Sequence, residues 1–205
     1  MTILSRKEYT KRIRDNELII SPILSRKQLG ISSIDLRVGN IVLMARARGL
    51  SHVDPHHYKS TKNEHDDIVG KRQKHERHEL TFLQKFLLHP GTLALVPTLE
   101  WVKLPHDLQG LVTTRSTWAR EGLNIATASF VEPNYEGIVT LELANLGQIP
   151  IALYPGLRIA QIAFCQMKGT TKPKIDESSQ FRMAFEPSEG NIALHDGAFI
   201  PEDVH

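Results

Sequence analysis

Apolar residues occur in short runs along most of this chain, and turn-forming residues separate the runs. From Leu18 onward the breaks carry Pro, Gly and Asn, as in His89-Pro90-Gly91 and Pro155-Gly156. Short runs with such breaks are typical of antiparallel β structure. The predicted strands are Ile34–Val38, Ile41–Met44, Phe86–Leu88, Thr92–Val96, Glu100–Val102, Leu111–Thr114, Ala128–Val131, Ile138–Asn145, Ile151–Leu153 and Arg158–Gln166. The pattern therefore predicts an all-β fold, either a barrel or a sandwich.

Two short helices interrupt the strand pattern. The first is predicted from Ser5 to Asn16, because Tyr9 and Ile13 share one helical face and Glu8 can complete a capping box with Ser5. The second is predicted at Ser116–Glu121, between two strands.

Length and charge narrow the class of protein. The 205 residues suffice for one domain with a buried core. Lys plus Arg number 25 and Asp plus Glu 23, so the net charge of +2 does not indicate a broad nucleic-acid or membrane face. No apolar run is long enough to cross a bilayer, and the N-terminal residues lack the apolar core of a secretion signal. We therefore expect a cytoplasmic protein without nucleic-acid or membrane partners.

Cysteine usage excludes several kinds of site. Cys165 is the only cysteine, so an intrachain disulfide, a Cys-x-x-Cys redox pair and a zinc site with two thiolates are all impossible. Because Cys165 follows the apolar run Ile159–Phe164, we expect it to be a small core residue.

Two segments stand apart from a β domain spanning residues 1–167. His52–Glu79 is polar and contains six histidines. It can be a solvated insertion or a metal site, but its spacing matches no closed metal motif, so no metal ligand is predicted. The tail from Lys168 to His205 has few apolar residues; it can be a flap, an arm that crosses to another subunit, or a disordered end.

The first candidate for chemistry lies where the second helix begins. Arg115 and Arg120 flank the hydroxyl side chains of Ser116 and Thr117. Guanidinium groups, hydroxyls and free backbone N–H groups together suit an anion such as phosphate. The alternative is a capped helix with surface salt bridges.

The second candidate is an acid inside an apolar strand. Strand alternation places Leu141 and Leu143 on one face and Glu142 on the other. If that second face is solvent, Glu142 has no special role; if it lines a pocket, Glu142 is a desolvated carboxylate suited to acid–base catalysis. Glu132, at a turn, leaves the same two alternatives open.

An ordered set of short motifs resembles the dCTP deaminase branch of the trimeric dUTPase superfamily. The motifs spread over Ser21 to Met167 and keep the family's order. They are Ser33-Ile34-Asp35-Leu36-Arg37-Val38-Gly39-Asn40, Leu88-His89-Pro90-Gly91, Thr98-Leu99-Glu100, Leu104-Pro105, Arg115-Ser116-Thr117 through Arg120, Thr127-Ala128, Thr140-Leu141-Glu142-Leu143, and Pro155-Gly156 with Ile159 and Gln161. The resemblance implies a distorted β jelly-roll that forms a homotrimer with active sites between subunits.

The resemblance also implies a reaction. The family hydrolyses the 4-amino group of dCTP to give dUTP and ammonia, with magnesium on the triphosphate and without zinc. By position, Glu142 matches the general acid–base, and Ser116 and Arg120 match residues that place the water and that base.

Substrate contacts are implied in the same way. Arg115, with Ser116 and Thr117, would lie near the phosphates, and the backbone around Thr127 and Ala128 would hold the pyrimidine edge. Gln161 and Glu132 complete the set of implied substrate-binding residues, and no protein ligand to a metal is expected.

Several positions depart from the family pattern. Thr117 and Trp118 stand where the family has Ser-Leu, and Glu132 stands where the family has an Asp that positions water for phosphate cleavage. One extra methylene moves a carboxylate by about a bond length, which predicts loss of that second step. In the tail, Ser179-Gln180-Phe181 is the nearest counterpart of the family's closing flap, with Ala184 in place of a later Gln.

Three functions compete. The leading one is deamination of a deoxycytidine nucleotide, most simply dCTP to dUTP. The second is a dUTP diphosphatase, or a bifunctional enzyme that carries out both steps. The third is a non-catalytic nucleotide-binding trimer with a regulatory role, suggested by the altered tail and the histidine-rich segment.

Overall fold

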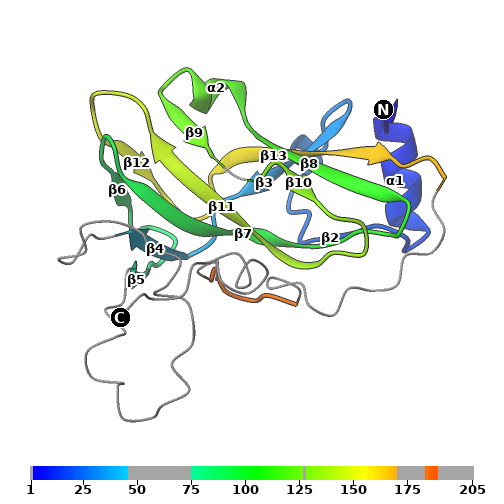
Figure 1. The fold of residues 1–205 in the computed structure, drawn as a ribbon, viewed down its shortest axis with the longest axis horizontal. Coiled ribbons are helices and arrows are strands. Elements are labelled where there is room, and N and C mark those ends of the chain that lie inside the picture. Colours follow the sequence, from blue (N-terminus) through cyan, green and yellow to red (C-terminus); the bar gives the residue numbers. More distant parts are fainter. Residues whose placement is uncertain (1, 46–74, 127, 170–182, 189–205) are drawn as a thin grey trace, which may run out of the picture.

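A computed structural model describes the chain except for residues 1, 46–74, 127, 170–182 and 189–205 (Figure 1). The described residues form packed β-sheets with one helix at the N-terminal end and a short one between strands. The elements are β1 (Thr2–Ile3), α1 (Arg6–Arg14), β2 (Ile19–Ser21), the 3₁₀ turn η1 (Arg26–Gln28), β3 (Ser33–Arg37), β4 (Ile41–Ala45), β5 (His75–Glu79), β6 (Phe86–Leu88), β7 (Leu93–Lys103), β8 (Leu108–Thr114), α2 (Ser116–Ala119), β9 (Leu123–Ile125), β10 (Phe130–Val131), β11 (Glu136–Asn145), β12 (Ile151–Leu153) and β13 (Arg158–Gln166).

The strands form two main sheets, and every pairing is antiparallel. The five-stranded sheet has the order β1-β13-β8-β10, with β3 also paired to β13; the six-stranded sheet has the order β5-β4-β7-β11-β9, with β2 also paired to β7. β6 and β12 form a separate ribbon. The prediction of an all-β fold with two short helices is confirmed, and the described strands close no barrel.

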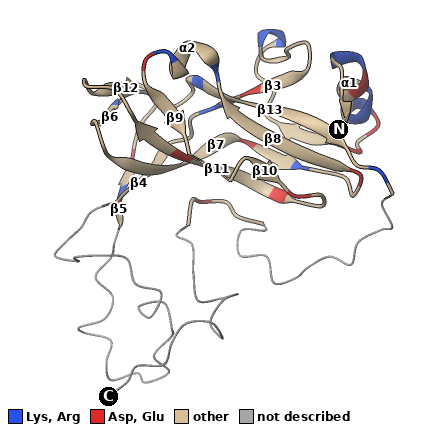
Figure 2. Ribbon diagram, turned by 45° about the horizontal axis from the view of Figure 1, so that its top comes forward, with Lys and Arg blue, Asp and Glu red and all other residues tan. Residues whose placement is uncertain are grey.

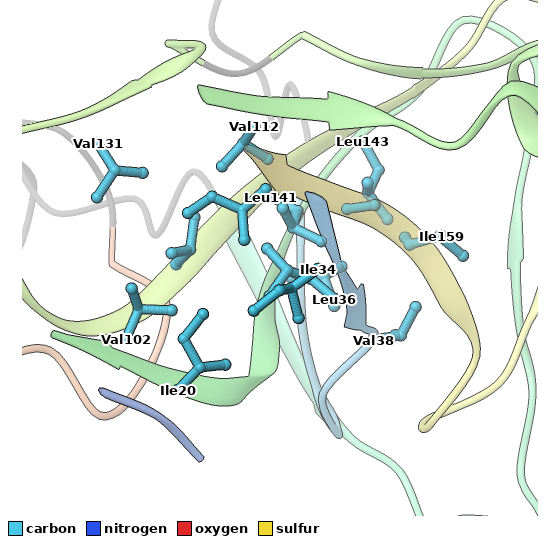
Figure 3. Packing of buried hydrophobic residues seen from close by; sticks show 14 of the residues in the cluster. Ile20, Ile34, Leu36, Val38, Val102, Val112, Val131, Leu141, Leu143 and Ile159 are labelled. Atoms are coloured by element: carbon cyan, nitrogen blue, oxygen red, sulfur yellow. The ribbon is translucent and has the colours of Figure 1, made fainter. Parts of the chain in front are cut away.

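The core lies between the two main sheets. Leu141 and Leu143 of β11 face Ile34 and Leu36 of β3, and all four side chains are fully buried (Figure 3). Alternation along each strand therefore sends one set of side chains into the core and the other set outward. Cys165 is buried in β13, as predicted.

The N-terminal helix is capped as its sequence predicts. Both the backbone N–H and the hydroxyl of Ser5 donate to the Glu8 carboxylate, at 2.7 and 2.8 Å. Tyr9 is fully buried, and its hydroxyl donates to the carbonyl of Gly30 at 2.6 Å. These contacts fix α1 against the five-stranded sheet, and the helix ends at Arg14, before the predicted Asn16.

Two predicted strands are one strand in the structure. Thr92–Val96 and Glu100–Val102 merge into β7, which continues through Pro97. The proline has no N–H to donate, but its carbonyl accepts from Gly39 at 2.8 Å, and it lies beside a register shift in β11. A proline at an irregularity need not end a strand.

A buried polar group ties β3, η1 and β7 together; we call Glu100, Arg37 and Gln28 the Glu100 network. The Glu100 carboxylate accepts from the Arg37 backbone N–H at 2.8 Å and from Gln28 Nε2 at 2.8 Å, and Arg37 Nη1 lies 3.0 Å from it. Arg37 Nη1 also donates to the Gln28 side-chain carbonyl. Glu100 and Gln28 are fully buried. Desolvation raises the pKa of Glu100 despite the opposing hydrogen bonds from Arg37.

The two segments set apart by composition are described in part. The last five residues of His52–Glu79 form β5, a strand that the sequence pattern did not predict; it pairs with β4, so that Arg77 lies opposite Leu43. The rest of that segment, with His52, His56, His57 and His65, lies outside the described residues. No helix in the described ranges is long and apolar enough to span a membrane.

Part of the tail lies along the six-stranded sheet, below β7 in Figure 1. Met183 donates its backbone N–H to Glu136 at 2.7 Å, and Ile138 donates to Ala184 at 3.0 Å. The ring of Phe185 lies 4.8 Å from that of Trp101, centroid to centroid. Met183 and Ala184 thus bind the start of β11 without forming a strand, while Ser179-Gln180-Phe181 lies outside the described residues.

Candidate functional site

Glu142 occupies the outward face of the six-stranded sheet. Its neighbours Leu141 and Leu143 are fully buried in the core, so alternation directs Glu142 the other way. Glu142 lies in register opposite Leu95, which forms a separate apolar cluster with Ile41 and Leu43 on β4 and β7. The carboxyl is half-buried, and this desolvation raises the pKa of Glu142. The carboxylate is thus partly desolvated on this outward face, and its role in catalysis stays a prediction.

The Glu142 backbone binds Ala126, which comes shortly before Ala128, one of the predicted pyrimidine contacts. The carbonyl of Glu142 accepts from the N–H of Ala126 at 2.8 Å, and β9 ends one residue before Ala126. Ala128 is exposed, and Thr127 lies outside the described residues. Ala126 therefore lies beside Glu142.

Arg115 lies at the end of β8 and is held by groups from two other strands. Its backbone N–H donates to the Ile159 carbonyl at 2.8 Å. Its Nε lies 3.2 Å from Oδ1 of Asp35, and its Nη1 donates to the Arg158 carbonyl at 3.2 Å. The guanidinium is 30% exposed, so it is both oriented and accessible.

Ser116, Thr117 and Arg120 lie on or directly after α2, and all three are exposed. Within the described chain their side chains make no hydrogen bond or ion pair. Trp118, which departs from the family pattern, donates its indole N–H to the Arg158 carbonyl at 3.0 Å and packs on the core. Trp118 thus anchors α2 and leaves the two hydroxyls and Arg120 facing outward.

Asp35 and Arg158 were not predicted as site residues. Asp35 lies between the buried Ile34 and Leu36, the same alternation that singled out Glu142, so this signal was present in the sequence. Arg158 begins β13 and gave no comparable signal.

Gln161 lies on the same outward face as Asp35. It is in register with Asp35 on β3 and with Thr113 on β8. Its amide donates to the Thr113 hydroxyl at 3.2 Å and accepts from the Ser33 hydroxyl at 3.5 Å. Glu132 is exposed in the turn after β10, and its carbonyl accepts from the Tyr135 N–H at 3.1 Å.

The predicted site residues thus form two groups on different sheets. Glu142 belongs to the outer face of the six-stranded sheet, whereas Arg115, through Asp35, belongs to the outer face of the five-stranded sheet. Among the described residues, the acid that pairs with Arg115 is Asp35, not Glu142. In the described ranges, no group of three or more His, Cys, Asp or Glu side chains could hold a metal ion.

The described residues form a two-sheet β protein with a half-buried acid on the outer face of one sheet and a carboxylate-paired arginine on the outer face of the other. Residues 3–167 match the family model described as dCTP deaminase-like, and the chain belongs to this family. The resemblance stated from the motifs is therefore confirmed.

Named relatives agree with the family match. A protein of Dictyoglomus turgidum named "dCTP deaminase, dUMP-forming" is 40% identical over 167 residues, 80% of each chain. A protein of Methanobrevibacter smithii with the same name is 30% identical over 200 residues, 95% of this chain and 97% of its own. A protein of Natronomonas pharaonis named "dCTP deaminase" is 36% identical over 81% of each chain.

A solved structure supports the fold. The crystal structure of 2'-deoxycytidine 5'-triphosphate deaminase from Agrobacterium tumefaciens superposes with a TM-score of 0.58 at 22% identity. The match covers 79% of this chain but only 47% of that longer chain, so it bears on the fold alone.

Proposed function

We propose that this chain is an enzyme that hydrolyses the 4-amino group of dCTP, with Glu142 as general acid–base. The observation that carries the proposal is the half-buried Glu142 carboxyl, whose pKa desolvation raises, within a domain that matches the family over residues 3–167. A carboxylate of raised pKa is a better base toward water at neutral pH than an ordinary glutamate. The substrate would be the magnesium complex of the nucleotide.

In the proposed step, ionised Glu142 takes a proton from water, and the resulting hydroxide adds to C4 of the pyrimidine. Glu142 returns that proton to N3, and a further transfer from the new hydroxyl to the amine lets ammonia leave. Ser116 and Arg120 would orient the water and the carboxylate, and a nearby guanidinium would stabilise the charge that develops. The balance is dCTP plus water to dUTP plus ammonia.

The two groups of site residues favour an active site between copies of the chain. Glu142 and Arg115 face outward from different sheets, and Ser116, Thr117 and Arg120 are exposed and lack side-chain partners within the described chain. A homotrimer, as implied by the resemblance, would bring Glu142 of one copy to the arginine group of another.

The product expected from the sequence needs correction. The departure at Glu132 predicted that the reaction stops at dUTP, yet relatives at 40%, 38%, 35% and 30% identity are named dUMP-forming. We therefore favour the bifunctional alternative, in which dUTP and water give dUMP and pyrophosphate. Glu132 is exposed on a turn, where rotation of the side chain can accommodate the extra methylene.

The test is a product assay with dCTP and magnesium that follows ammonia, dUTP, dUMP and pyrophosphate. Ammonia, dUMP and pyrophosphate in equal amounts would support the bifunctional enzyme. Ammonia with dUTP alone would support a deaminase without the second step. Pyrophosphate from dUTP but no ammonia from dCTP would indicate a diphosphatase, and tight binding without turnover would indicate a regulatory trimer.

Glu132→Gln should separate the two steps. If the carboxylate positions the water that attacks the phosphate, the amide variant should still release ammonia while dUTP accumulates, with pyrophosphate release reduced by about 10²-fold. Glu121→Gln, an exposed acid just after α2, is the matched control and should form dUMP normally. Unchanged dUMP formation in Glu132→Gln would remove Glu132 from the second step.

A further inference from the structure

A single carboxylate holds two guanidinium groups at the candidate anion site. Asp35 Oδ1 lies 3.2 Å from Arg115 Nε, and Asp35 Oδ2 accepts from Arg158 Nη1 at 3.1 Å. The acid is the least exposed of the three, at 13% against 30% and 32%. Asp35 comes from β3, while its partners come from the end of β8 and the start of β13. One side chain thus connects three strands at this point.

The contacts of Arg115 engage two of its three guanidinium nitrogens. Its Nε faces Asp35 and its Nη1 donates to the Arg158 carbonyl at 3.2 Å. No acceptor among the described residues takes a hydrogen bond from Nη2. A guanidinium that is held through Nε and Nη1 and open at Nη2 can bind a phosphate oxygen with little loss of side-chain entropy.

Asp35 is itself rigidly placed. Its carbonyl accepts from Gln28 Nε2 at 2.9 Å, and the same nitrogen donates to the buried Glu100. Arg158 Nη1 also donates to the Lys27 carbonyl at 2.9 Å, which joins η1 to the pair of arginines. The Glu100 network therefore supports Asp35 from the core side.

The local charge suits a polyanion. Two guanidiniums on one carboxylate leave a net positive charge, and Arg26 and Lys27 are exposed on the adjoining η1. Figure 2 shows basic residues near α2 and on the loop that carries η1. Partly exposed ion pairs contribute little to stability. We therefore expect Asp35 to affect the orientation of the two arginines more than the stability of the fold.

We infer that Asp35 is a positioning residue for the polyphosphate of the nucleotide: it fixes Arg115 with Nη2 open and holds Arg158 alongside as a second cation. The inference rests on the proposed function for its natural ligand, a nucleoside triphosphate. Asp35 acts through the arginines and contacts no reacting atom.

Asp35→Asn tests this role, with Asp107→Asn as the matched control. Asp107 pairs with Arg12 at 2.7 Å and is 16% exposed, so it is a similar ion pair outside the proposed site. We expect Asp35→Asn to raise the KM for dCTP about tenfold with kcat within about twofold, because a less ordered arginine weakens binding. Asp107→Asn should change neither value. If Asp35→Asn does not fold, Asp35→Glu is the second variant, because it keeps the negative charge. Its longer side chain should raise the KM for dCTP less than Asp35→Asn does.

A binding measurement separates this inference from the proposed reaction. Calorimetry with inorganic tripolyphosphate and magnesium needs no turnover, and we expect about tenfold weaker binding to Asp35→Asn than to the parent or to Asp107→Asn. If the parent protein binds tripolyphosphate but does not turn over dCTP, the proposed function fails and the positioning role stands on this measurement. If both Asp35 variants bind as tightly as the parent, or more tightly, the acid only neutralises charge and the inference is overturned.

Discussion

Glu142→Gln should abolish deamination of dCTP, with turnover reduced by at least about 10²–10⁴-fold, the range for loss of a general acid–base. The amide keeps the shape of the side chain but cannot take a proton from water. Binding of dCTP should stay within about threefold, because the proposed phosphate contacts involve Arg115, which lies on the other sheet. Ammonia release and equilibrium binding of dCTP measure the two effects separately.

The stability of the Glu142→Gln variant distinguishes a chemical defect from unfolding. Because burial raises the pKa of Glu142, the folded chain holds this proton more tightly than the unfolded chain does. The corresponding stabilisation is complete below the unfolded-state pKa and is lost as pH rises through the folded-state pKa. At neutral pH the variant therefore lacks a desolvated charge and should melt at or above the parent's temperature.

The same shift predicts the pH dependence of the parent enzyme. Glu142 must be ionised to accept a proton, so kcat/KM should fall as pH drops through its raised pKa. The acid limb should lie above the usual glutamate value of about 4.3. Glu136→Gln is the control on the same strand, since Glu136 pairs with Lys103 at 3.1 Å outside the proposed site. Substantial turnover in Glu142→Gln, or an equal loss in Glu136→Gln, would contradict the assignment.

Local alternation was sufficient to predict the central strands but not the edges. β11 and β13 alternate between core and outward positions, and the predicted ranges nearly match those observed. β5 consists only of polar residues, His75–Glu79, and forms because β4 offers a free edge. Pairing of this kind depends on a distant partner, which a local pattern does not contain.

For the site residues too, local patterns could be predicted from the sequence, whereas contacts with distant strands could not. Alternation gave the face of Glu142, but its burial depends on Leu95 and the cluster on β4 and β7. The motif around Arg115 predicted an anion site, while its partner Asp35 comes from a strand far away in the sequence. The sequence motif identifies the side chains, but the burial of Glu142 and the ion pair of Arg115 depend on residues that are distant in the sequence.

The Glu100 network should be the polar group on which the stability of the described fold depends most. Arg37 is only 8% exposed, and its counter-charge is Glu100. In Glu100→Gln the amide nitrogen would face donors in either orientation: the Arg37 backbone N–H in one, and both Gln28 Nε2 and Arg37 Nη1 in the other. The guanidinium would remain buried without an acid. Loss of one partner from a buried ion pair costs about 3–5 kcal/mol, because the other charge is left uncompensated.

We therefore expect Glu100→Gln to lower the free energy of unfolding by about 3–5 kcal/mol and the Tm by roughly 10 °C, measured by denaturant titration and thermal melting at one protein concentration. Glu79→Gln removes an exposed pair, 3.4 Å from Arg77, and should change stability by less than about 0.5 kcal/mol. Because Gln28 links Glu100 to the Asp35 carbonyl, the folded fraction of Glu100→Gln should also bind tripolyphosphate more weakly. Equal stability of the two variants would mean that β3, η1 and β7 hold together through their apolar contacts alone.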